Sequence, residues 1–338
     1  MERIRWIDAV KGIAILLVML SHLSEQSMPV LTWLTYGYVP MFFIMVGLTY
    51  HPASDWKATL RKRTLRIWAP YIFYGLSILI VTSIFSKNVS FTHGLLGLLY
   101  GRYNLYPIGS EYSFGLLSKC YYIAPLWFLP CLYFSYLLMM VQDRISNQWI
   151  LPLCALVLST LSQYKTILLP YSLDTCFIGF LFIWIGYKWG QRMAELQYQR
   201  MWDILLLILC IAIYWGVGTI NGHNNMSLGV FGQIAPWSVL CFLVLGITET
   251  MFFSVLFRWI DNSFITIVFS YIGREALRLM CIHIVLGSLF YKLFCYVAIP
   301  SIVGLLLSIV GVIGINAVIS FLINRLSRFG GRGLISNL

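Results

Sequence analysis

The chain has 338 residues, of which 60% are hydrophobic and only 10% are charged. This composition excludes an ordinary soluble domain, in which about a quarter of the residues are charged. The formal net charge is +11, but basic residues gather in the cytoplasmic loops of membrane proteins. The excess of Lys and Arg therefore does not predict a nucleic-acid partner.

About ten apolar segments approach the roughly 20 residues that a helix needs to cross a bilayer. They predict one all-α, polytopic membrane domain that covers residues 1–338. The predicted helices cover 7–26, 31–50, 67–86, 121–141, 149–164, 171–188, 203–220, 231–257, 265–291 and 298–324. Most Lys and Arg residues fall in the loops on one side, so the positive-inside rule predicts that both termini are cytoplasmic.

Three ionisable residues lie along one face of the first predicted helix, RIRWIDAVKGIAILLVMLSH. Asp8 is one turn before Lys11. Lys11 and His22 are eleven residues apart, which is about 20° from eclipsed and about 16 Å along the axis. Ionisable groups are costly inside a membrane and usually face a functional interior. The structural alternative is an Asp8–Lys11 pair near the interface and a His22 that bonds a backbone carbonyl.

One long ligand could use both Lys11 and His22, although the two side chains cannot touch each other. An acyl-coenzyme A has this shape, with phosphates at one end and a thioester at the other. Imidazole titrates near neutral pH, so His22 suits a general base or a nucleophile.

A basic stretch, RKRTLR, precedes the third predicted helix. Arg63 and Arg66 are three residues apart and share a helical face. Arg side chains bind phosphate well, so the pair could hold a nucleotide-like head group. The alternative is a membrane anchor that attracts anionic lipid.

Further ionisable residues fall near the outer ends of later predicted helices. Asp174 could accept a sugar hydroxyl, or it could cap a helix. The segment YIGREALRLMCIH contains Arg274, Glu275, Arg278 and His283, which form either a site or a structural ion cluster. We expect an acceptor to dock from outside between the first, sixth and ninth helices, beneath the loop 87–120. No CxxC pair occurs, so we expect neither disulfides nor a metal site.

These segments together resemble the membrane-bound acyltransferase family 3, the integral-membrane O-acyltransferases of bacterial surface glycans. The family's Arg/Lys-x10-His pattern falls on Lys11 and His22, and its Arg-x-x-Arg pattern falls on Arg63 and Arg66. Three further segments resemble the family in the same order: 40–50, 125–134 and 271–283. The chain resembles the short, stand-alone members. Members often carry Asn-Ser where this chain has Glu275-Ala276.

The resemblance implies transfer of an acyl group, usually acetyl, from cytoplasmic acyl-coenzyme A to a hydroxyl of a surface glycan or lipid-linked sugar. The reaction is expected at the outer face of the bacterial inner membrane. Together with the spacing of the charged groups, the resemblance predicts catalytic roles for His22 and Asp8, donor binding by Lys11, Arg63 and Arg66, and acceptor binding by Asp174, Glu275 and His283.

Two other functions use the same residues. A transporter or flippase for a lipid-linked sugar or an anionic solute would use the buried charges as a permeation path. An acyltransferase could also act on a protein or a lipid. The sequence leaves open the sugar and its hydroxyl, the acyl chain, an acyl-histidine or direct transfer, and the oligomeric state.

Overall fold

The computed structural model describes residues 4–23, 34, 36–85, 90–103, 105, 121–193, 200–297, 299 and 301–329. These residues form helices and connections, with a single isolated bridge between Asn225 and Val230. The α-helices are α1 (Arg5–Leu23), α3 (Tyr38–Leu48), α4 (Trp56–Phe85), α5 (Phe91–Tyr100), α6 (Phe128–Gln142), α7 (Ile150–Leu161), α8 (Cys176–Met193), α9 (Arg200–Asn221), α10 (Ser238–Trp259), α11 (Phe264–Arg274), α12 (Ala276–Tyr296) and α13 (Ser301–Phe329). The prediction of an all-α polytopic membrane protein is confirmed.

Six helices in the described part of the chain are long and apolar enough to cross a membrane. They cover Trp56–Phe85, Ile123–Gln142, Trp202–Asn221, Ser238–Trp259, Ala276–Tyr296 and Ile302–Leu322. Three apolar helices are shorter: Tyr38–Leu48, Ile150–Tyr164 and Phe264–Arg274. Leu205, Ile208 and Leu209 on α9 are among many exposed large apolar residues, as expected for surfaces that face lipid. The cytoplasmic position of the termini stays a prediction.

Three predicted boundaries were wrong. α4 begins at Trp56 rather than at 67, because Asp55 caps it: its Oδ1 accepts from the backbone N–H groups of Lys57 (3.0 Å) and Ala58 (3.1 Å). The basic stretch therefore lies within the first half of α4. The loop 87–120 contains α5, which Ser90 caps. The predicted helix 31–50 retains helix over Tyr38–Leu48, and 24–33 lie outside the described residues.

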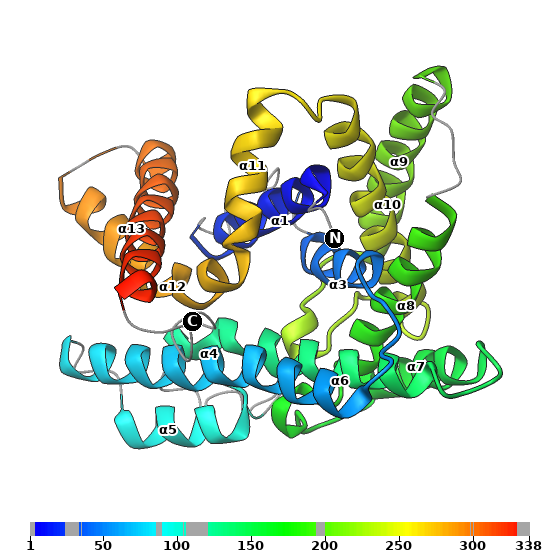
Figure 1. The fold of residues 1–338 in the computed structure, drawn as a ribbon, viewed down its shortest axis with the longest axis horizontal. Helices are drawn as coiled ribbons and strands as arrows, with labels where there is room; N and C mark the ends of the chain where they lie inside the picture. The colour runs from blue at the N-terminus through cyan, green and yellow to red at the C-terminus, as the bar shows by residue number, and fades with distance from the viewer. Residues whose placement is uncertain are drawn as a thin grey trace.

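The ninth predicted helix, 265–291, is two helices rather than one. α11 ends at Arg274 and α12 begins at Ala276, with Glu275 between them at φ −96°, ψ 4°. This backbone conformation lies in the bridge region, outside the helical range. The chain therefore changes direction at Glu275, and α11 and α12 diverge in Figure 1.

α1 lies in the middle of the molecule and crosses α11 at very close range (Figure 1). Gly12 and Gly273 make this approach possible. A Cβ atom on Gly12 would lie 2.0 Å from the carbonyl oxygen of Phe269, and one on Gly273 would lie 1.7 Å from that of Asp8. Small residues let membrane helices pack backbone against backbone. Arg5 at the start of α1 also bonds Asn262, just before α11.

We predict that Gly273→Ala and Gly12→Ala each destabilise the protein, because an added methyl group would force α1 and α11 apart. Overpacking of this kind costs about 1–3 kcal/mol. Gly314→Ala on α13 is the matched control, since nothing lies within 4 Å of its Cβ position. Thermal unfolding in detergent checks the difference. Equal melting temperatures for Gly273→Ala and Gly314→Ala would contradict the close crossing.

Candidate functional site

The structure brings together the two histidines that the sequence placed in different roles. The ring centroids of His22 at the end of α1 and His283 in the middle of α12 are 5.3 Å apart, with an interplanar angle of 41°. His22 is exposed, whereas His283 is fully buried. His283 therefore lies deeper in the protein than His22.

His283 is held by its own helix. Its Nδ1 lies 3.1 Å from the carbonyl oxygen of Leu279 and 3.0 Å from that of Met280. Carbonyl oxygens only accept hydrogen bonds, so Nδ1 carries the proton in the neutral ring and Nε2 is an acceptor. Among the described residues, this buried Nε2 has no hydrogen-bond partner.

Asp8 and Lys11 form an ion pair near the other end of α1. Lys11 Nζ lies 3.4 Å from Asp8 Oδ1. Asp8 precedes His22 by 14 residues of continuous helix, which is about 21 Å along the axis. The charged pair therefore lies toward one end of α1 and the histidine pair at the other, and a catalytic role for Asp8 stays a prediction.

The two predicted donor-binding arginines lie on α4, on a different helix from Lys11. The Arg63 guanidinium lies 4.4 Å from the ring centroid of Tyr136 on α6, a cation–π contact that positions it. Tyr136 in turn packs edge-on against Tyr50, with centroids 5.3 Å apart. Arg66 is exposed. Their joint action with Lys11 on a phosphate-bearing ligand stays a prediction.

Glu275 takes part in an ion cluster at the break between α11 and α12. Arg278 Nη1 lies 3.0 Å from Glu275 Oε2, and the hydroxyl of Ser320 on α13 donates to Glu275 Oε1 over 3.3 Å. Both oxygens of this carboxylate therefore have partners from the chain. The geometry favours the structural alternative for Glu275, and its contact with an acceptor stays a prediction.

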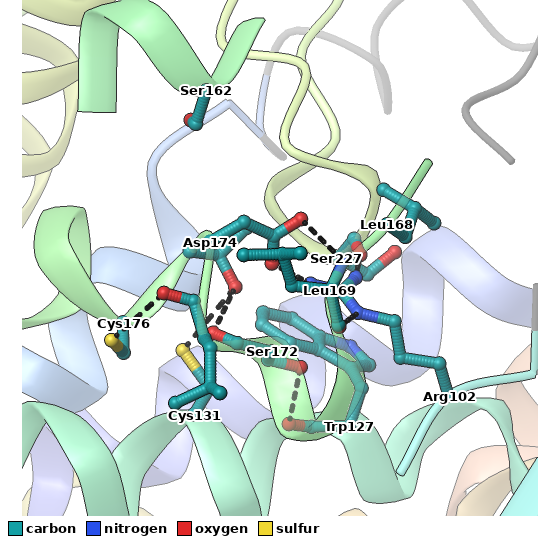
Figure 2. A network of polar contacts seen from close by, with 12 residues as sticks. Arg102, Trp127, Cys131, Ser162, Leu168, Leu169, Ser172, Asp174, Cys176 and Ser227 are labelled. Atoms are coloured by element: carbon teal, nitrogen blue, oxygen red, sulfur yellow. Dashed lines mark hydrogen bonds and ion pairs between the residues drawn. The ribbon is translucent and has the colours of Figure 1, made fainter. Parts of the chain in front are cut away.

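Asp174 lies at the centre of a second buried ion cluster (Figure 2). Its Oδ1 accepts from Arg102, and its Oδ2 lies 2.5 Å from Lys165 Nζ and accepts from the backbone of Leu169. Arg102 also donates to the carbonyl oxygens of Leu169 and Ser227. Asp174 is thus neither a helix cap nor an exposed acceptor. It joins the segments that contain Arg102, Lys165 and Ser227.

Burial and charge act against each other in this cluster. Burial lowers the pKa of Arg102 and of Lys165, while the neighbouring Asp174 carboxylate raises both. The turn before Asp174 is strained, because Tyr171 and Ser172 have φ values of 52° and 60°. Such conformations cost about 1–3 kcal/mol each. The ion pairs help to hold this turn.

Sequence reasoning missed a polar group beside α3. Glu249 on α10 is buried and accepts from the hydroxyl of Tyr214 on α9 over 3.0 Å. The same hydroxyl accepts from the backbone N–H of Tyr36 over 3.0 Å. Closer to His22, Ser21 donates to the Tyr38 hydroxyl over 3.3 Å. The signal for Glu249 was a lone carboxylate within an apolar segment.

The chain matches a family of known proteins. The acyltransferase domain family, Acyl_transf_3, matches residues 4–325. No curated protein and no solved structure gives a significant match. The matched region contains both histidines and both ion clusters.

We predict that Asp174→Ala lowers the free energy of unfolding by about 3–5 kcal/mol, because it leaves Arg102 and Lys165 buried without a counter-charge. Adding Lys165→Met should recover part of the loss. Asp55→Asn is the control, since an amide oxygen can still cap α4. Thermal unfolding in detergent measures all three. If Asp174→Ala keeps the wild-type stability and loses only acyl transfer to the acceptor, the result would instead support an acceptor contact.

Proposed function

Because this chain belongs to the acyltransferase family, we propose that it is an O-acyltransferase that uses acyl-coenzyme A, most simply acetyl-coenzyme A, as its donor. The proposed acceptor is a hydroxyl of a surface glycan or of a lipid-linked sugar at the outer face of the bacterial inner membrane. Membership of the family favours acyl transfer over the transporter and flippase alternatives.

The observation that carries this proposal is the position of His22. It is the exposed member of a histidine pair, and its helix carries the Asp8–Lys11 pair about 16–21 Å away. A donor that binds by its phosphates near Lys11, Arg63 and Arg66 would extend its flexible arm toward His22. An acceptor from the opposite side would meet the thioester there.

His22 can promote transfer in two ways. As a general base it takes the proton of the acceptor hydroxyl while the oxygen attacks the thioester carbonyl carbon; the C–S bond then breaks, and the thiolate recovers the proton from His22. As a nucleophile its unprotonated nitrogen attacks the thioester carbonyl carbon, the C–S bond breaks, and the thiolate takes the remaining ring proton; the acceptor oxygen then attacks the acyl group, the C–N bond breaks, and the hydroxyl proton returns to the imidazole. Both routes need an accessible imidazole.

We predict that His22→Ala lowers transfer by at least about 10²-fold, since a general base contributes about 10²–10⁴-fold. Donor affinity should stay within about twofold of the wild type, because His22 lies away from the proposed phosphate contacts. Ser21→Ala is the neighbouring control. Transfer of a radiolabelled acetyl group in proteoliposomes gives the rate. Near-normal turnover by His22→Ala would exclude His22 as the centre.

We predict that Arg63→Ala and Arg66→Ala each weaken coenzyme A binding by about 1.5–3 kcal/mol, the range for hydrogen bonds to charged groups. The matched control is Arg61→Ala, an exposed residue on the same helix. Isothermal titration calorimetry at two salt concentrations gives the affinities. Equal affinities for the Arg63, Arg66 and Arg61 variants would favour the membrane-anchor alternative.

A further inference from the structure

The buried, unpartnered nitrogen of His283 is the feature that the proposed reaction leaves unexplained. An imidazole nitrogen without a hydrogen bond is costly inside a protein, so such groups usually have a partner. His283 Nε2 is buried and unpartnered among the described residues, and the ring of His22 is the neighbouring aromatic group. A partner in the working protein would satisfy it.

We propose that His283 is a positioning residue for His22: its Nε2 accepts an N–H bond from the His22 ring. At a centroid separation of 5.3 Å, a rotation of the His22 ring can bring one of its nitrogens within hydrogen-bond distance of His283 Nε2, which is about 2.9 Å. This inference rests on the proposed function for its catalytic consequence, but the pair itself is a structural statement that can be tested alone.

The backbone of α12 fixes which nitrogen of His283 can accept. The carbonyl groups of Leu279 and Met280 require a proton on Nδ1, which leaves the lone pair on Nε2. A bond to this lone pair would place the remaining proton of His22 on the side of His283. The other nitrogen of His22 would then carry a lone pair toward the substrate.

This arrangement serves proton transfer. When His22 takes the proton of the acceptor hydroxyl, it becomes an imidazolium with two N–H groups, one of which is held by His283. The proton then passes from His22 to the departing thiolate of coenzyme A, and His22 returns to its starting state. His283 stays neutral throughout, and it performs without charge the orienting role that a carboxylate performs in a hydrolase triad.

The burial of His283 separates this role from direct acceptor binding. His283 has 0% relative exposure, whereas His22 is exposed. The side chain of His283 therefore offers no exposed surface to a sugar hydroxyl. His283 can therefore influence the substrate through His22, and its predicted role in acceptor binding is replaced by a role in orientation.

Two substitutions distinguish the roles of the two nitrogens of His283. In His283→Asn the side-chain amide can occupy the place of Nδ1 and bond the α12 carbonyls, but it cannot reach His22. In His283→Gln the amide can occupy the place of Nε2 and accept from His22. If His283 acts only through its bonds to the α12 carbonyl groups, the Asn variant should keep the wild-type transfer rate. If His283 positions His22, the Gln variant should keep that rate.

The first measurement is independent of activity. The full chain is labelled with ¹⁵N-histidine in lipid nanodiscs, and solid-state NMR reads the tautomer of His22, whose signals are assigned with His22→Gln. We expect one neutral His22 tautomer in the wild type and in His283→Gln, and a mixture in His283→Asn. An identical His22 tautomer in the wild type and in His283→Asn would overturn the proposal.

The second measurement is the transfer rate with acetyl-coenzyme A. We expect kcat to fall by about 10²-fold in His283→Asn, with an unchanged KM for the donor, and most of kcat to return in His283→Gln. Rescue by Asn and not by Gln would overturn the positioning role. If NMR shows the pair but the wild type transfers no acyl group, the proposed function fails and the pair stands.

Discussion

The backbone contact between α1 and α11 is the constraint on which the rest of the site depends. Gly12 and Gly273 let the two helices meet at a distance that no side chain would permit. This contact and the bond from Arg5 to Asn262 place the start of α11 beside the start of α1. α11 then crosses α1, so that Gly273 near its end lies beside Asp8 and Gly12 in the first half of α1.

The break at Glu275 follows directly after the crossing of α1 and α11. A straight helix over 265–291 would continue in the direction of α11, whereas α12 turns and brings His283 to the end of α1. The ion cluster of Glu275 with Arg278 and Ser320 occupies the turn and ties it to α13. Glu275 and Arg278 thus lie at the turn between α11 and α12, and His283, further along α12, lies beside His22.

The sequence was sufficient for the membrane class, the helical fold and the positions of Lys11, His22 and Arg63, because apolar length and helical spacing are local properties. The start of α4 was not predicted, because the basic stretch after Asp55 hides the helix from an apolar-length search, although Asp is a preferred N-cap residue. The break at Glu275 was not predicted either, because the contacts beside it, with α1 and α13, join residues far apart in the sequence. The pairing of His22 with His283, and of Asp174 with Arg102 and Lys165, likewise depends on long-range packing that spacing cannot show.

We propose that donor and acceptor reach His22 from opposite sides of the membrane. Membrane vesicles of both orientations, from cells that make the protein, test it with radiolabelled acetyl-coenzyme A added outside. We expect label in glycan only in inverted vesicles, where the cytoplasmic face is outside, and we expect that label to be protected from an added deacetylase until detergent is present. Equal labelling in right-side-out vesicles, or label exposed on the donor side, would contradict it.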